Sequence, residues 1–165
     1  MSRSPISLQD QFGSQGVCFG CGPKNERGLQ LKSFVESDQI VAEWMPKPGF
    51  EGFENMMNGG IIASLMDCHS NWAAAWYLMQ SKQLDRPLST VTGRFSITYL
   101  QPTIMTDLVH LYATLKTISE SRVDIETKLH SQNKNTAIFS GTFIAVKPDH
   151  PAYNQWTTGH GRAWS

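Results

Sequence analysis

The stretch NGGIIASLMDCHSNWAAAWY, residues 58–77, predicts a long helix that is apolar around most of its circumference. Asn58 is a preferred N-cap residue, because its side chain can accept a hydrogen bond from the first backbone N–H groups of a helix. The apolar positions are Ile61, Ile62, Leu65, Met66, Trp72, Ala73, Trp76 and Tyr77. Since these positions occupy more than one helical face, we expect the helix to be buried at the centre of the fold.

Segments on both sides of this helix alternate between polar and apolar residues, as strands with one buried face do. Two strands are predicted before the helix, within residues 28–37 (GLQLKSFVES) and 39–44 (QIVAEW). Four longer ones follow it at 88–100, 108–118, 122–131 and 135–146, and the short turns between them predict an antiparallel meander. This order gives an α+β fold in which a long antiparallel sheet wraps around a central helix, the hotdog arrangement.

The length of 165 residues suits one domain. We expect it to span residues 18–147, between a flexible N-terminal arm at 1–17 and a tail at 148–165. Fourteen basic and fourteen acidic residues cancel, so charge gives no sign of nucleic-acid or membrane-surface binding. No apolar run approaches the roughly 18 residues of a membrane span. The polar first residues show no secretory signal, so a cytoplasmic protein is expected.

Chemistry is most strongly indicated at the start of the predicted helix. Gly59 and Gly60 leave backbone N–H groups uncovered by side chains, and the positive end of a helix suits an anion or a polarised carbonyl oxygen. Asp67 lies two turns further on, in otherwise apolar surroundings, where a carboxylate is costly unless it is paired or has a function. The alternative is that Asp67 bonds a neighbouring hydroxyl and the glycines only allow close packing.

Three motifs of this chain resemble the phenylacetyl-CoA-type hotdog thioesterases over roughly residues 18–147. Residues 58–67 resemble their His-Gly-Gly-(x)6-Asp signature, and CFGCGPKNERGLQL at 18–31 resembles the Cys-x-x-Cys-Gly-x-x-Asn-x-x-Gly-Leu-x-Leu opening of a subset of them. TGRFSITYLQP at 92–102 resembles the strand that follows the helix. The resemblance implies an acyl-CoA thioesterase that forms a homodimer or a dimer-of-dimers tetramer. It implies no cofactor, since coenzyme A is part of the substrate.

The resemblance also implies roles for individual residues. The backbone N–H of Gly60 would bind the thioester oxygen, and Asp67 would be the general base for a water molecule or the attacking carboxylate. Thr92 would orient the water or the carboxylate. Asn58 stands where the family has a histidine, and it can cap the helix and donate a hydrogen bond but cannot titrate.

Helix geometry argues separately that two chains share the site. Seven residues separate Gly60 from Asp67, which is roughly 10 Å along a helix axis and too far for both to act on one carbonyl group. Two chains related by a twofold axis could supply one residue each. The resemblance implies the same arrangement.

Further residues are candidates for substrate binding. Gly59 would line the substrate site beside Gly60, Arg94 could meet a coenzyme A phosphate, and Trp72 could limit the depth of an apolar acyl tunnel. A solvated strand face is an equal interpretation of Arg94. In the alternating pattern, Thr92 would point away from the helix unless the strand bulges at Gly93.

A metal site is weighed and not expected. Cys18 and Cys21 form a Cys-x-x-Cys pair, but no second such pair follows at a useful spacing. Cys68 and His69 could complete four ligands, but both lie in the predicted central helix, where a free cysteine is usually a small core residue. The pair is therefore interpreted as a turn packed under the sheet.

Two other functions remain open. A non-catalytic protein that binds acyl-CoA or aromatic ligands could use the same fold. Asn58 in place of histidine favours this second hypothesis. A hotdog dehydratase or hydratase would resemble its family through a histidine and a carboxylate before the helix. The loop here offers Glu51 and Glu54 but no histidine, which disfavours it.

Overall fold

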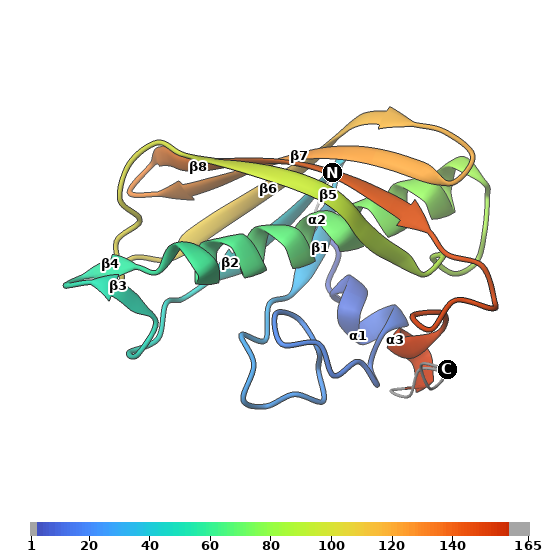
Figure 1. Cartoon of the computed structure of the whole chain (residues 1–165), viewed down its shortest axis with the longest axis horizontal. Coiled ribbons are helices and arrows are strands. Elements are labelled where there is room, and N and C mark those ends of the chain that lie inside the picture. Colours follow the sequence, from blue (N-terminus) through green and yellow to red (C-terminus); the bar gives the residue numbers. More distant parts are fainter. Residues whose placement is uncertain (1–2, 159–165) are drawn as a thin grey trace.

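The computed structural model describes residues 3–158, which form three helices and eight strands (Figure 1). In chain order these are α1 (Leu8–Phe12), β1 (Ser33–Glu36), β2 (Gln39–Trp44), β3 (Glu51–Phe53), β4 (Met56–Met57), α2 (Gly59–Ser81), β5 (Thr90–Tyr99), β6 (Val109–Ile118), β7 (Arg122–Ser131), β8 (Lys134–Ala145) and α3 (Gln155–Thr158). The predicted central helix, its Asn58 cap and the six main strands are confirmed within a few residues, except that the first strand begins only at Ser33.

The main sheet has six antiparallel strands in the order β1-β2-β6-β7-β8-β5. The predicted meander is therefore correct for β6, β7 and β8, but wrong for β5, which pairs with β8 at the sheet edge. The segment between β5 and β6 does not form a tight turn. It passes the β4 end of the molecule, where the N–H of Met57 donates to the carbonyl of Thr103 over 2.9 Å.

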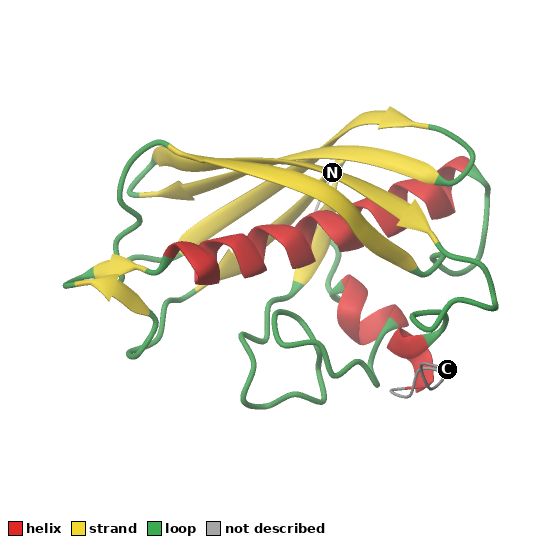
Figure 2. Ribbon diagram, viewed as in Figure 1, coloured by secondary structure: helices red, strands yellow, loops and turns green. Residues whose placement is uncertain are grey.

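Helix α2 runs along one face of this sheet, as Figure 2 shows in red against yellow. The inward side chains of β6, β7 and β8 meet it in a continuous core, and they are fully buried; among them are Leu111, Leu129, Ala137, Phe139 and Phe143. The N-terminal loop and α1 cover the opposite side of α2 (Figure 1). Because both sides are covered, the helix has apolar residues nearly all round. None of the described helices is long and apolar enough to cross a membrane.

Over residues 3–17, the N-terminal segment differs from the flexible arm that its sequence suggests. Ser7 caps α1, and both Leu8 and Gln9 are buried. The amide of Gln9 bonds the hydroxyl and the backbone N–H of Ser33, so α1 is tied to the start of β1. These long-range contacts hold a segment whose local sequence is polar.

The C-terminal tail packs on its own chain through α3. Trp156 stacks on Trp72 of α2, with ring centroids 4.4 Å apart. The sequence left open disorder or packing on a neighbour, and the stacking of Trp156 on Trp72 places the described part of the tail against its own chain. Trp164 lies outside the described residues.

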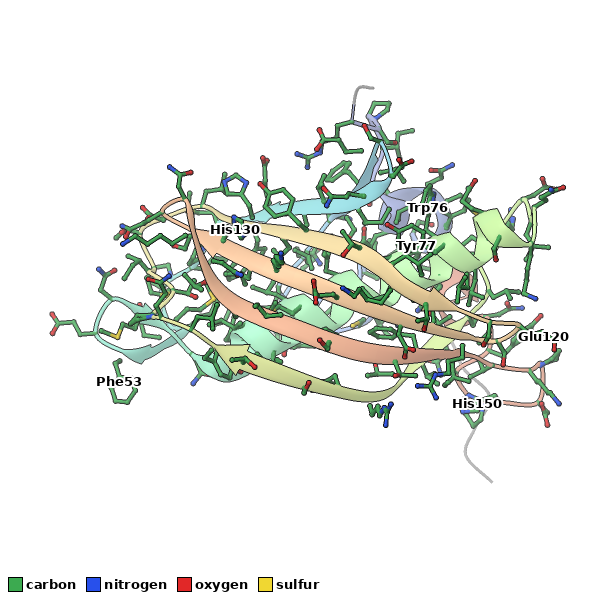
Figure 3. The ribbon with its side chains drawn as sticks, turned by 90° about the horizontal axis from the view of Figure 1, so that it is seen from above. Phe53, Trp76, Tyr77, Glu120, His130 and His150 are labelled. Carbon is green, nitrogen blue, oxygen red and sulfur yellow. The ribbon has the colours of Figure 1, made fainter. Side chains whose placement is uncertain are left out.

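A small hairpin, β3–β4, was not predicted and lies beside the start of α2. Phe53 is 79% exposed, and Figure 3 shows it and Trp76 towards opposite ends of the molecule. Strand β5 forms a free sheet edge in a single chain and carries exposed apolar side chains at Phe95 and Tyr99. Apolar surface at a sheet edge is typical of a region that another chain covers.

Candidate functional site

Asp67 and Thr92 form the central contact of the candidate site. Asp67 projects from the third turn of α2, and the Thr92 hydroxyl on β5 donates a 2.8 Å hydrogen bond to its Oδ1. Both side chains are partly buried, which leaves the carboxylate accessible from one side. The two residues that the sequence singled out separately are therefore one unit.

A bulge in β5 makes this contact possible. The pairing register between β5 and β8 shifts between Thr92 and Arg94, so Gly93 is the extra residue. Without that shift, strict alternation would turn Thr92 away from α2 while Ile97 and Tyr99 face it. The sequence-based condition for Thr92 to reach the helix, a bulge at Gly93, is thus confirmed.

The surroundings of Asp67 favour a carboxylate that can accept a proton. Burial raises the pKa of Asp67 above its usual value, and the charge of nearby Cys18 adds to that rise. The hydrogen bond from Thr92 acts in the opposite direction and favours the ionised form. Within residues 3–158, no ion pair to this carboxylate is present, and the Thr92 hydroxyl is the group that holds it in place.

The start of α2 is built from Asn58, Gly59 and Gly60. Asn58 caps the helix, and its Oδ1 accepts a 2.7 Å hydrogen bond from the Gly60 N–H. The hydroxyl of Tyr99 donates to the Gly59 carbonyl over 2.8 Å, and its ring closes one side of Gly59. A side chain at position 60 would meet only the Asn58 cap, so there is free space beside that residue.

An open groove adjoins this helix end, with a volume of about 300 Å³. Its walls come from the β3–β4 hairpin, the first turn of α2 and the end of β5, and they include Phe53, Met56, Gly59, Ile62 and Tyr99. Most of these side chains are apolar. An open groove with mostly apolar walls is suited to an apolar ligand.

The groove and the carboxylate lie apart within one chain. Asp67 does not line this groove, and the helical rise puts it roughly 10 Å from Gly60. The neighbouring Gly59 lines the groove beside β3–β4, whereas Asp67 lies beside the start of β5, at Thr92. This placement agrees with the geometric argument that one chain cannot bring both groups to one carbonyl.

Two of the proposed substrate-binding residues lie elsewhere. Arg94 lies on the outer face of the sheet, opposite to Thr92, where its Nε lies 3.5 Å from the Thr142 hydroxyl. Trp72 is buried under the N-terminal loop, and its indole N–H points to the Cys21 sulfur at 3.4 Å. Neither residue meets Asp67 or Gly60 within one described chain.

The three cysteines lie together beside Asp67. Their sulfur atoms are all within 4.8 Å of one another, and the Cys18 and Cys68 sulfurs are 3.6 Å apart. Hydrogen bonds from Cys21 and Cys68 hold the pKa of Cys18 far below its ordinary value. The hydrogen bond between Cys21 and Cys18 raises the pKa of Cys21 to about 12. The sequence argument against a metal assumed that Cys68 stood apart from the Cys-x-x-Cys pair, and it does not.

Sequence reasoning did not single out Tyr99 or the hairpin residues Phe53 and Met56 as parts of a site. The alternation of this strand puts Tyr99 on the side that faces the helix, but it gives no reason for a hydroxyl there. Its position at the end of β5, shortly before Pro102, was the available signal. The hairpin had none, because its loop reads only as a turn-rich connection.

Comparison with known proteins bears on the fold and the family. No family model and no curated protein matches the chain. Among solved structures, a thioesterase superfamily protein from Shewanella loihica is 30% identical, with 71% of this chain and 91% of that chain covered and a TM-score of 0.58. The PaaI protein of the Escherichia coli phenylacetic acid degradation operon is 17% identical, with 72% and 81% covered and a TM-score of 0.61.

A third structure, of a Streptococcus mutans protein bound to acetyl CoA, is 14% identical, with 70% of this chain and 88% of that chain covered and a TM-score of 0.59. At 17% and 14% identity, the Escherichia coli and Streptococcus mutans structures are evidence for the fold alone. They confirm the long antiparallel sheet around a central helix.

Proposed function

Because the chain belongs to the thioesterase superfamily, we propose that it hydrolyses an acyl-CoA thioester to the free acid and coenzyme A. The observation that carries this proposal is the hydrogen bond from Thr92 to Asp67 at the edge of a central hotdog helix. It gives a partly buried carboxylate a fixed direction, which general-base catalysis requires.

The reaction begins when Asp67 removes a proton from a water molecule whose oxygen attacks the thioester carbonyl carbon. The carbonyl oxygen becomes an oxyanion, which the Gly60 N–H at the positive end of α2 stabilises. Collapse of this intermediate breaks the carbon–sulfur bond, and protonated Asp67 returns its proton to the leaving thiolate. In the other form, the Asp67 carboxylate itself attacks, the carbon–sulfur bond breaks and the coenzyme A thiolate leaves and takes a proton from solvent. Water then hydrolyses the acyl-aspartate anhydride to the free acid and the Asp67 carboxylate.

Two chains complete the site in this proposal. The exposed apolar residues of β5 and the hairpin would be covered by a partner, and the groove of one chain would then adjoin Asp67 of the other. The acyl or pantetheine chain would lie in that groove. Support comes from the separation of Gly60 and Asp67 along one helix.

A panel of acyl-CoA thioesters tests the proposal. Short aliphatic, long aliphatic and aromatic substrates are incubated with the protein, and release of free coenzyme A is followed by chromatography. We expect turnover of at least one class and no turnover with Asp67→Asn. Absence of hydrolysis across the whole panel, from a protein shown to be folded, would reject the proposal.

A second candidate function, binding of acyl-CoA without hydrolysis, is favoured by one observation. The Gly60 N–H that should bind the oxyanion is already bonded to Asn58 Oδ1. A protein that only binds would tolerate this contact, whereas a hydrolase must break it during each turnover. Calorimetric titration with the same panel distinguishes the two functions, because binding without product release would support the second.

A further inference from the structure

The sulfur atoms of Cys18, Cys21 and Cys68 form a compact triangle in which all three residues are free thiols. Cys18 and Cys21 come from the N-terminal loop. Cys68 comes from α2 and lies 47 residues after Cys21 in the sequence. Cys21 is buried, Cys68 is partly buried and Cys18 is exposed, so one corner of the triangle is open to solvent. Packing of a turn against a helix does not require three thiols at one point.

The dimensions of the triangle fit a metal ion rather than a disulfide. A tetrahedral zinc ion with Zn–S bonds of about 2.3 Å separates its sulfur ligands by about 3.8 Å. The Cys18 and Cys68 sulfurs are 3.6 Å apart, and no pair among the three exceeds 4.8 Å. A disulfide needs about 2.05 Å and would leave the third thiol unused.

The polypeptide around the triangle is shaped to bring the loop onto α2. Gly20 lies directly against the helix, because a Cβ there would come within 2.3 Å of the Cys68 sulfur. Gly22 follows Cys21 in the tight turn, and its N–H donates to the Cys18 carbonyl over 2.9 Å. The indole N–H of Trp72 lies 3.4 Å from the Cys21 sulfur and fixes it from the other side. Such supporting contacts are typical of metal-ligand shells.

From this arrangement we propose that Cys18, Cys21 and Cys68 bind one zinc ion, which fastens the N-terminal loop to α2 beside Asp67. Thiolate ligands select soft or borderline ions, and zinc accepts three of them with a fourth ligand of another kind. Among the described residues no further histidine, cysteine, aspartate or glutamate joins the cluster, so the solvent-facing fourth position takes a water molecule. Binding displaces the thiol protons to solvent.

Metal analysis of the purified, reduced protein tests the proposal independently of hydrolysis. We expect about one zinc ion per chain by elemental analysis. Replacement of zinc by Co²⁺ should produce the strong near-ultraviolet absorption of sulfur-to-metal charge transfer. Removing the ion with a chelator should lower the melting temperature and increase amide hydrogen exchange in residues 16–31.

Variants separate ligand loss from general damage. Cys18→Ser should fold, because the residue is exposed, and it should lose its zinc on dialysis and fail to give the Co²⁺ absorption. Ser64→Ala, one turn before Cys68 on the same helix, should keep a full equivalent of zinc and serves as the control.

Three results would overturn the proposal. The first is a reduced wild-type protein that contains no zinc and takes none from a chromophoric chelator. The second is a Cys18→Ser variant that retains a full equivalent. The third is a Co²⁺ form without sulfur charge transfer, since the ion would then be bound elsewhere.

Discussion

The hydroxyl of Thr92 donates a 2.8 Å hydrogen bond to the carboxylate of Asp67, across the boundary between β5 and α2. The contact depends on a single extra residue in β5, Gly93, which reverses the direction in which the first part of the strand presents its side chains. Local backbone geometry therefore decides whether the carboxylate has an orienting partner.

Replacement of Asp67 should abolish hydrolysis while the fold remains. Asp67→Asn keeps the shape and the contact with Thr92 but cannot accept a proton, so kcat should fall by about 10²- to 10⁴-fold. Steady-state kinetics and a melting curve on the same preparation measure both effects. Glu126→Gln, which changes a carboxylate on β7 that pairs with Lys116, should leave kcat unchanged. Near-normal turnover by the Asp67 variant would remove Asp67 from the mechanism.

Thr92 should act through Asp67 rather than on the substrate. Thr92→Val removes a hydrogen bond to a charged group, worth about 1.5–3 kcal/mol, so kcat should fall by about ten- to hundredfold with little change in KM. Thr92→Ser retains the hydroxyl and should restore most of the rate. Thr98→Val, on the same strand, serves as the control. If the serine variant were as slow as the valine variant, the hydroxyl would not be the relevant group.

Two inactive variants should rescue each other if the site is shared between chains. Asp67→Ala lacks the carboxylate, and Gly60→Pro lacks the backbone donor at a helix position that tolerates proline. A mixed dimer then has one complete site and one that lacks both groups. Since random mixing gives about half mixed dimers, roughly a quarter of wild-type activity should return.

This experiment requires that each parent variant is folded and dimeric, and that the two chains are co-expressed with different tags. Activity is measured on the mixed dimer purified through both tags, where about half of wild-type activity is expected because one of its two sites is complete. Mixed dimers as inactive as either parent would show that the two residues do not act across an interface.

A buried histidine on α2 should matter for stability. His69 is fully buried, its Nε2–H donates to the Ile40 carbonyl over 3.0 Å, and its Nδ1 lies 2.9 Å from the Ser33 hydroxyl. His69→Leu removes the two hydrogen bonds of the imidazole and should lower the free energy of unfolding by about 1–3 kcal/mol. Urea denaturation measures it. An unchanged midpoint would contradict the prediction. His130→Leu serves as the control, and because His130 is partly exposed, its replacement should change the free energy of unfolding by less than about 0.5 kcal/mol.

The sequence predicted most of the fold because its periodicities were strong. The apolar circumference of α2 and the alternation in β6, β7 and β8 each identify an element and its buried side. The position of β5 was wrong, since alternation says which face of a strand is buried but not which strand it pairs with. The sequence also could not predict that Leu8 and Gln9 are buried in a fixed position, because Gln9 bonds to Ser33 of β1, which is far along the chain.

The candidate site could be predicted in its residues but not in its assembly. Spacing in the helix led to Asn58, Gly60 and Asp67, and the bulge at Gly93 was foreseen as a condition. The meeting of Cys68 with the Cys18 pair could not be, because it depends on how the loop crosses α2. Arg94 lies on the outer face, as its interpretation as part of a solvated strand face requires, because the bulge reverses only the part of β5 that precedes it.

The cap at the start of α2 has a consequence for ligand affinity. Asn58 Oδ1 holds the Gly60 N–H at 2.7 Å, so an oxygen belonging to the protein already occupies the donor that a carbonyl group would need. Asn58 therefore behaves as a tethered competitor, present at the high effective concentration of a group on the same chain. The affinity of the helix end for an acyl oxygen therefore depends on the difference in free energy between two hydrogen bonds of the Gly60 N–H, one to the ligand and one to Asn58. Shortening the side chain at position 58 would remove the second bond and raise the affinity for the ligand.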